Sequence, residues 1–98
     1  MRRASFLPSA KIALVELRIY LTKASGSRNV PRKFIARLRD HCHYLASLPF
    51  EMGKSRSELG PEMRSANFEN YVILFRYNED RFEIVNIIEG HRDLSFNE

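Results

Sequence analysis

The last third of the chain shows the clearest pattern of apolar and polar positions. Two runs rich in branched and aromatic side chains, Tyr71–Tyr77 and Arg81–Glu89, lie on either side of Asn78-Glu79-Asp80. Turn-forming residues between two such runs indicate a β-hairpin. The first run is apolar on both alternating sets, which is typical of a central strand covered on both faces. With the preceding run Met63–Phe68, the pattern predicts an antiparallel meander of three strands.

Alternation also assigns the second hairpin run to two faces. Consecutive strand residues point to opposite sides of a sheet. One alternating set of this run therefore contains Phe82, Ile84 and Ile88, and the other contains Val85 and Ile87.

A helical period occupies the first part of the chain, after a short strand candidate at Arg3–Leu7. We expect Ser9 to cap a helix that runs to about Ala24 and ends at Gly26. One face follows the i, i+3, i+4, i+7 rule and contains Ala10, Ala13, Leu14, Leu17, Tyr20, Leu21 and Ala24. The side expected to be polar carries a second apolar stripe, formed by Ile12, Val15 and Ile19. A helix apolar on two sides has to bury both, and packing against a second helix is favoured over packing against another chain.

A second helix is predicted to open near Asn29, with Pro31 in its first turn, and to stop at Pro49. Its buried stripe consists of Ile35, Leu38, Cys42 and Leu45. A short Ser-Gly-Ser segment joins the two helices, which indicates a helical hairpin lying across one face of the sheet. The sequence thus predicts one α+β domain over residues 1–98, in the order β-α-α-β-β-β, with the hairpin packed on a small antiparallel sheet.

Composition limits the class of protein more than its function. With 98 residues, 44% hydrophobic and 29% charged, the chain is of ordinary globular composition and has room for one core. No stretch approaches the ~20 apolar residues of a membrane span, and Arg2-Arg3 precede too short an apolar run for a signal peptide. A single cysteine fits a reducing cytoplasm. Sixteen Lys+Arg against twelve Asp+Glu give a net charge of +4, a modest bias toward anionic partners.

Few residues suggest catalytic or metal chemistry. In His41-Cys42-His43 the imidazoles are two positions apart, so on a helix they point about 200° apart and cannot hold one ion. Cys42 is interpreted as a core residue. The phosphate-binding and dinucleotide glycine motifs are absent, and no serine or cysteine has a recognisable base motif beside it. We therefore predict no metal, no cofactor and no catalytic residue.

Positive side chains gather around one end of the predicted sheet: Lys54, Arg56, Arg64, Arg76 and Arg92. Around a concave face they could hold a phosphate backbone or the carboxylates of an acidic protein. Internal ion pairs are the alternative, in which Arg64 or Arg92 pairs with Asp93 or Glu89.

Several short motifs stand in a distinctive order between Leu7 and Leu94. They are Ala10-x-x-x-Leu14-x-x-Leu17-x-x-Tyr20-Leu21, Leu38-Arg39, Leu45-x-x-Leu48-Pro49, Gly53-Lys54-x-Arg56-x-Glu58-Leu59-Gly60, Met63-Arg64-Ser65, Tyr71-Val72-Ile73 and Gly90-x-Arg92-Asp93-Leu94. In order and separation these motifs resemble the ParE toxins of bacterial type II toxin-antitoxin systems, within the RelE/ParE superfamily.

The resemblance implies a cytoplasmic poison that a small ParD-like antitoxin neutralises in a hetero-oligomer. ParE members typically act on DNA gyrase, RelE members cut ribosome-bound messenger RNA, and operator DNA would be reached only through the antitoxin. The antitoxin would lay an amphipathic helix over apolar surface of the first helix and the sheet. The residues expected to meet it are Ile12, Val15, Ile19 and Phe75.

The ribonuclease branch supplies two lysines, an arginine and a late tyrosine that move the proton and hold the phosphorane charge. The positions that match are Gly60, Glu62, Val72 and, loosely, Phe96. A glycine, an acid and two apolar residues cannot together move the proton and hold the phosphorane charge. A gyrase inhibitor without catalytic activity is therefore favoured. A RelE-type mRNA endonuclease and a non-toxic binding module on the same fold are the alternatives. The sequence departs from the ParE pattern at Ala13, Lys54, Asn86 and Glu89. These departures affect the prediction of the target more than the prediction of the fold.

Overall fold

A computed structural model describes residues 2–90. The elements are β1 (Arg3–Phe6), α1 (Pro8–Ser25), α2 (Asn29–Ser47), β2 (Lys54–Ser55), a 3-10 turn (Ser57–Leu59), β3 (Arg64–Phe68), β4 (Tyr71–Asn78) and β5 (Arg81–Glu89). They form a five-stranded sheet in the order β1-β5-β4-β3-β2. The predicted α+β class, the helical hairpin and the meander are confirmed.

The sheet is mixed, whereas the sequence analysis expected an antiparallel one. Strand β1 pairs with β5 in parallel, with Arg3 opposite Arg81 and Phe6 opposite Ile84. The remaining pairs are antiparallel. Parallel pairing needs a long crossover between the strands, and the two helices after β1 are part of that connection. The two-residue strand β2, in the segment between α2 and β3, adds the other edge.

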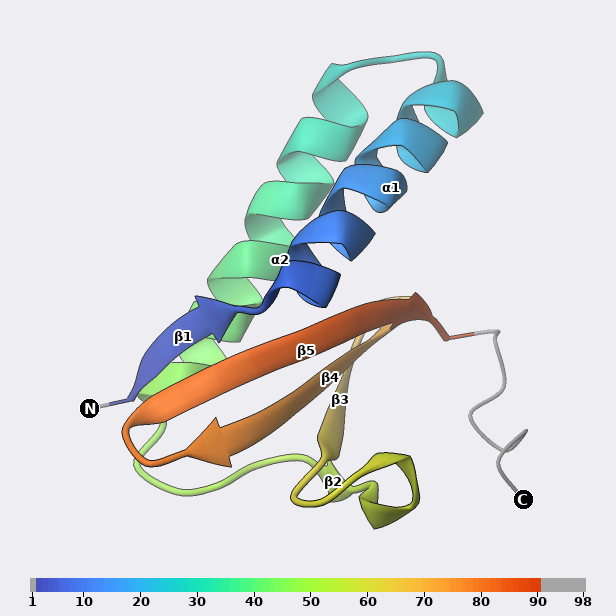
Figure 1. The fold of residues 1–98 in the computed structure, drawn as a ribbon. Helices are drawn as coiled ribbons and strands as arrows, with labels where there is room; N and C mark the ends of the chain where they lie inside the picture. Colours follow the sequence, from blue (N-terminus) through green and yellow to red (C-terminus); the bar gives the residue numbers. More distant parts are fainter. Residues whose placement is uncertain (1, 91–98) are drawn as a thin grey trace.

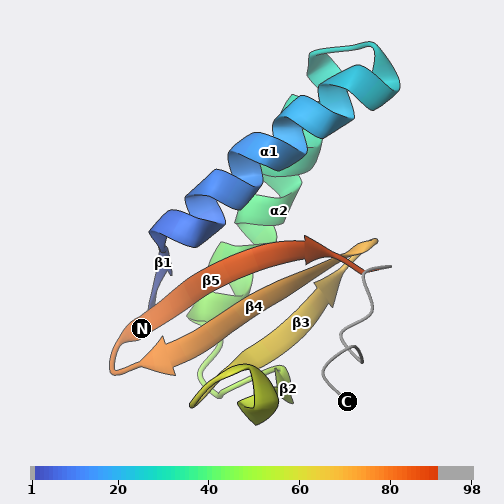
Figure 2. The same cartoon turned by 45° about the vertical axis from the view of Figure 1, so that its right-hand side comes forward.

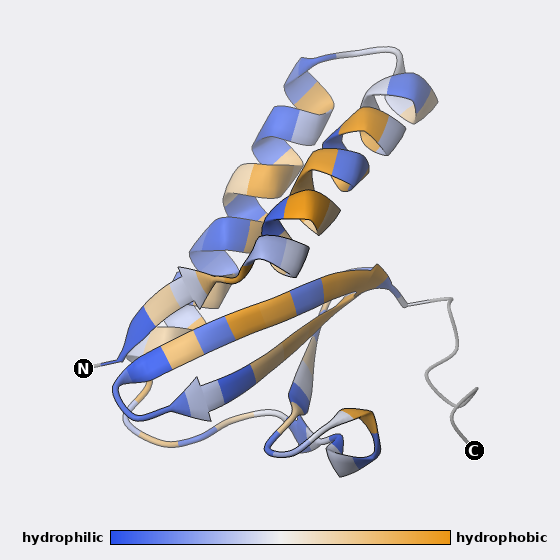
Figure 3. Ribbon diagram, viewed as in Figure 1, coloured by the Kyte–Doolittle hydropathy of each residue, from blue (hydrophilic) through white to orange (hydrophobic). Residues whose placement is uncertain are grey.

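Both helices lie on one side of the sheet, and their joining turn projects away from it (Figures 1 and 2). The main core lies between the layers. Its members include Ala10, Leu14, Leu38, Cys42, Phe75, Phe82 and Ile84. Phe75 and Phe82 stack with ring centroids 4.4 Å apart. The hydropathy colouring of Figure 3 shows hydrophobic bands along β5 and α1. No helix within residues 2–90 is long and apolar enough to cross a membrane.

The packing is closest near the sheet and sparse toward the far end of the hairpin. None of the residues from Arg18 to Val30 is buried. In α2, by contrast, Phe34 packs against the rings of Phe68 and Tyr71, at centroid distances of 5.7 and 5.4 Å. The hairpin is therefore held by α2 and the first part of α1, and among the described residues from Arg18 to Val30, Leu21 is the hydrophobic residue that packs against the main core.

A β-bulge in β5 breaks the simple alternation. Leu74 lies opposite Asn86 and Phe75 opposite Ile84, so Val85 has no residue opposite it in β4. Ile84 and Ile87 consequently both belong to the core under the helices, although they are three positions apart. The predicted grouping of Ile88 with Ile84 is wrong, because an extra residue reverses the faces of everything after it.

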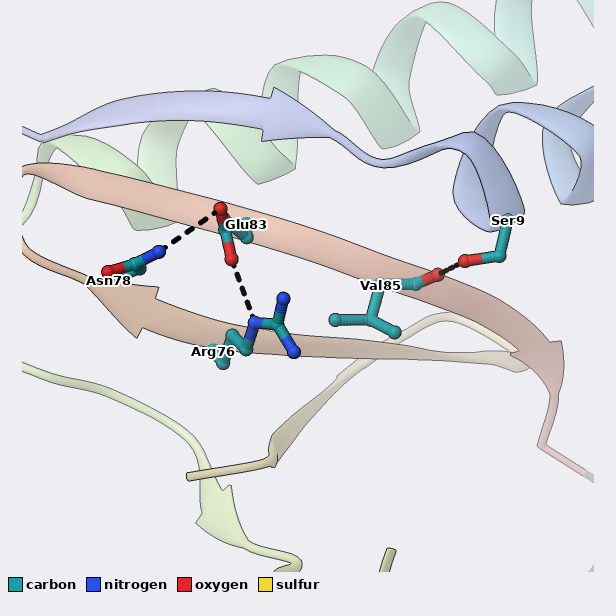
Figure 4. A network of polar contacts seen from close by, with 5 residues as sticks. All are labelled: Ser9, Arg76, Asn78, Glu83 and Val85. Atoms are coloured by element: carbon teal, nitrogen blue, oxygen red, sulfur yellow. Dashed lines mark hydrogen bonds and ion pairs between the residues drawn. The ribbon is translucent and has the colours of Figure 1, made fainter. Parts of the chain in front are cut away.

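Ser9 contacts this bulge and does not cap the helix. Helix α1 begins at Pro8 with Leu7 as its N-cap, and no side chain caps it. The prediction that Ser9 caps the helix is therefore wrong. Its hydroxyl instead donates a hydrogen bond to the main-chain carbonyl of Val85 (Figure 4). This contact ties the start of α1 to the bulge, 76 positions away in sequence.

The segment after α2 is held against the sheet by a close approach at Gly53. Its φ of 89° lies in the region that favours glycine. A Cβ there would come within 2.6 Å of the Phe75 ring and 2.8 Å of the Ser65 carbonyl oxygen. Only glycine fits at this position. Gly53 therefore allows the segment between α2 and β3 to pass close to the sheet.

Candidate functional site

Arg76, one of the predicted contact residues, is paired within the sheet. Its Nε donates to a carboxylate oxygen of Glu83 at 2.7 Å, across the β4–β5 ladder. The Asn78 amide approaches the second oxygen of Glu83 at 3.5 Å (Figure 4). The hydrogen bond from Arg76 is the main cause that lowers the pKa of Glu83, and it outweighs the effect of burial. Arg76 is thus a partner for a buried carboxylate.

Arg64 anchors the segment that follows α2. Its Nε donates to the Met52 carbonyl at 2.8 Å, and its Nη1 lies 3.9 Å from a carboxylate oxygen of Glu51. The main-chain N–H of Met52 donates to the Tyr77 hydroxyl at 2.8 Å. Arg64 thus has internal partners, although the carboxylate near it, Glu51, is not one of the two that were predicted. Asp93 lies outside the described residues.

Arg56 and Lys54 complete the part of this group that the structure describes. The Arg56 Nε donates to the Ser65 hydroxyl at 3.0 Å, and its Nη1 lies 3.6 Å from Glu58. Lys54 is exposed in β2, opposite Ser65. Arg92 lies outside the described residues.

The sheet does not gather these cations on one face. Arg64 lies opposite Phe75 in the register and therefore shares the side that faces the helices. Arg76 follows Phe75 in the strand and points to the other side. The single concave cluster expected from the sequence is thus divided between two faces.

The second apolar stripe of α1 lies on the surface. Ile12, Val15 and Ile19 are 59%, 49% and 52% exposed. The expectation that this stripe packs on α2 is wrong, because α1 turns its other side, with Leu14 and Leu17, toward the core. The stripe is therefore apolar surface that the described residues leave uncovered.

Phe75 and Tyr20 occupy the opposite environments from those predicted. Phe75, proposed as an antitoxin contact, is 0% exposed and lies in the main core. It is therefore not part of any binding surface in this structure. Tyr20, assigned to the buried face of α1, is 57% exposed, although it lies close enough to Tyr71 of β4 to help raise the pKa of that side chain.

A cavity at the tip of the hairpin, with four cations among its lining residues, was not predicted from the sequence. It has a volume of about 380 Å³ and is lined by Arg18, Ile19, Thr22, Lys23, Arg28 and Arg32. No ion pair within residues 2–90 involves these four cations. A count by segment would have indicated the region, since residues 8–48 contain eight Lys+Arg and only two Asp+Glu.

The histidine and cysteine motif on α2 has a structural role. The His41 ring packs 5.0 Å from the Phe68 ring, and His43 lies edge-on to Phe6 at 6.3 Å. Cys42 is fully buried, as expected, and burial raises the pKa of its thiol to about 12. A thiol with this pKa stays protonated at neutral pH and is a poor nucleophile. Among the described residues no cluster of His, Cys, Asp or Glu could hold a metal ion.

Comparison with known families identifies the family to which this chain belongs. A family model described as "ParE toxin of type II toxin-antitoxin system, parDE" matches residues 4–94. The chain belongs to the ParE toxin family. Among solved structures, a chain of the "Chromosomal ParDE TA system from P. aeruginosa" superposes with a TM-score of 0.77 at 15% identity, covering 91% of this chain and 96% of that one. No curated protein sequence matches the chain.

In this ParE toxin, the position that matches the arginine of the ribonuclease branch is a buried apolar residue. Val72 is 7% exposed and packs with Met63 and Leu74 in a small second core on the helix-free side of the sheet. Burial, then Glu89 and Tyr20, raises the pKa of Tyr71, so its hydroxyl stays protonated and is unsuited to act as a base. Phe96 lies outside the described residues.

Proposed function

We propose that this ParE toxin acts in the cytoplasm by binding DNA gyrase without catalytic turnover, and that a ParD-like antitoxin neutralises it by covering α1. The observation that carries the antitoxin contact is the exposed stripe of Ile12, Val15 and Ile19. At spacings of three and four residues these side chains form one continuous surface on the helix. An amphipathic helix is the partner element that fits such a stripe.

The stripe is large enough to matter for affinity. Full burial of an aliphatic side chain stabilises by roughly 1.5–3 kcal/mol, and these three are about half exposed before binding. Their burial therefore supplies a few kcal/mol toward a complex. Val15 lies at the centre, where hot-spot residues of an interface are usually found.

Substitution of Val15 by Asp tests the antitoxin contact. A carboxylate at the centre of an apolar interface is buried without a partner, so we expect a loss of about 2 kcal/mol or more, roughly thirtyfold in Kd. Calorimetric titration of purified toxin with its antitoxin measures it. The matched control is Tyr44→Asp, which changes a residue 58% exposed on α2. Unchanged affinity of the Val15 variant, with its circular dichroism unaltered, would exclude this contact.

The gyrase target rests on membership of the ParE family and on the residues at positions 60, 62 and 72, which offer no nuclease chemistry. A supercoiling assay with purified gyrase tests it. We expect inhibition at micromolar toxin that scales with the ratio of toxin to enzyme, as stoichiometric binding requires. Translation-dependent cleavage of messenger RNA, abolished by Arg64→Ala, would replace this proposal with a nuclease. Harmless overproduction without antitoxin would point to a non-toxic binding module.

A further inference from the structure

The cavity at the hairpin tip concentrates positive charge without any internal neutralisation in the described residues. Arg18 and Lys23 reach it from α1, and Arg28 and Arg32 from α2. The two other lining residues, Ile19 and Thr22, are uncharged. Apolar atoms form most of the cavity wall, so the four charged groups, which are exposed, repel each other at the surface around it, and an anion bound there relieves this repulsion.

The location of the cavity makes it accessible. The tip projects beyond the sheet (Figures 1 and 2), and no residue from Arg18 to Val30 is buried. The N-terminus of the 19-residue helix α2 also lies there, and its dipole adds to the positive potential. A long partner could therefore contact the tip without meeting the sheet.

The positive charge extends from the cavity along the hairpin. Residues 8–48 carry eight Lys+Arg against two Asp+Glu, whereas residues 49–98 carry six against ten. The modest net charge of +4 therefore conceals two halves of opposite sign. Such an asymmetry is typical of proteins that turn one end toward a polyanion.

We infer that the hairpin tip binds the phosphate backbone of a nucleic acid, with Arg28 and Arg32 as the central contacts. These two residues are one helical turn, roughly 6 Å, apart along α2. Duplex DNA presents one charge per ~1.7 Å of its axis, so both guanidinium groups can meet phosphates together. Nucleic-acid interfaces are much more positively charged than protein interfaces, in which lysine is depleted although arginine is enriched. Four cations among six lining residues match the second kind of interface.

A salt titration tests this site. The full-length toxin, without antitoxin or gyrase, is titrated into a fluorescein-labelled duplex of mixed sequence, and anisotropy is followed between about 50 and 200 mM salt. We expect Arg28→Gln/Arg32→Gln to weaken binding about tenfold or more near physiological salt. The slope of log K against log salt should fall by roughly 2, about one for each lost phosphate contact.

Arg3→Gln/Arg81→Gln is the matched control, because it removes the same charge from two exposed residues that face each other at the β1–β5 edge. This control variant should leave the slope of log K against log salt unchanged. Equal losses in both double variants, or no loss in the tip variant, would overturn the inference. A polyglutamate peptide that binds as tightly as DNA at equal charge would also overturn it, in favour of an acidic protein. Neither readout depends on gyrase inhibition, so this proposal and the proposed function can fail separately.

Discussion

The arginines of the sheet and the cations of the hairpin tip have the same chemistry and opposite surroundings. Arg76 holds a buried carboxylate at 2.7 Å, and Arg64 holds a main-chain carbonyl at 2.8 Å. Arg28 and Arg32 lie at a cavity with two more cations and enter no ion pair within residues 2–90. Sheet arginines therefore satisfy polar groups that burial would leave unpaired, and tip cations are available to a partner.

This difference teaches how to interpret a basic residue in a small protein. An arginine next to a strand is close to many main-chain oxygens and cross-strand carboxylates, so internal pairing competes with binding. A cation on a projecting helix has few such neighbours. Changes at the sheet should therefore alter folding stability, and changes at the tip should alter binding alone.

The largest expected effect comes from the core that supports the sheet arginines. Phe75→Ala removes a ring that is 0% exposed and stacked on Phe82, and should lower the free energy of unfolding by about 3–5 kcal/mol. Urea denaturation followed by circular dichroism measures this. Phe50→Ala, at a site 56% exposed, is the control and should shift it by no more than about 0.5 kcal/mol. A small loss for Phe75 would mean that the ring is not buried as described.

A smaller effect is expected at the Arg76–Glu83 pair. Glu83→Gln keeps the shape but replaces a charged hydrogen bond with a neutral one, so we expect a loss of about 1 kcal/mol at pH 7. Because the pKa of Glu83 is lowered in the folded state, its contribution is complete above the ordinary glutamate pKa of about 4.3 and disappears as pH falls through the lowered value. The difference between wild type and variant should therefore shrink in acid. A difference independent of pH would show that charge is not involved.

The smallest effect on stability is expected at the tip. Arg28→Gln/Arg32→Gln removes two exposed cations that enter no ion pair within residues 2–90, and it should change the free energy of unfolding by no more than about 0.5 kcal/mol, with a gain from relieved repulsion as the favoured sign. Thermal denaturation at low and high salt measures both the size and the sign of this change in the free energy of unfolding. A loss of several kcal/mol would contradict the contrast between the two regions.

Local patterns in the sequence predicted most of the elements. Pro31 in the first turn and Gly26 at the end of α1 lie where they were expected, and the hairpin turn is Glu79-Asp80, one residue shorter than predicted because Asn78 belongs to β4. Errors arose where a partner distant in sequence decides the outcome. The bulge at Val85 and the Ser9 contact to its carbonyl involve residues far apart in the chain, and neither has a local signal.

The candidate site was harder to predict than the fold. The stripe of Ile12, Val15 and Ile19 was found from periodicity, but its exposure depends on which side of α1 meets the sheet. Phe75 carries no feature in the sequence that separates a buried strand residue from a surface contact. The tip cavity requires residues from both helices to converge, which residue spacing along one helix does not show.

The sequence by itself determined the order of elements, the apolar faces and the total charge, because these follow from side-chain type and from the fixed periods of helix and strand. Only the tertiary structure decided which charges are neutralised, which stripe stays exposed and where the faces of β5 reverse. Those outcomes depend on distances between groups far apart in the chain, and electrostatic and packing energies follow distance in space.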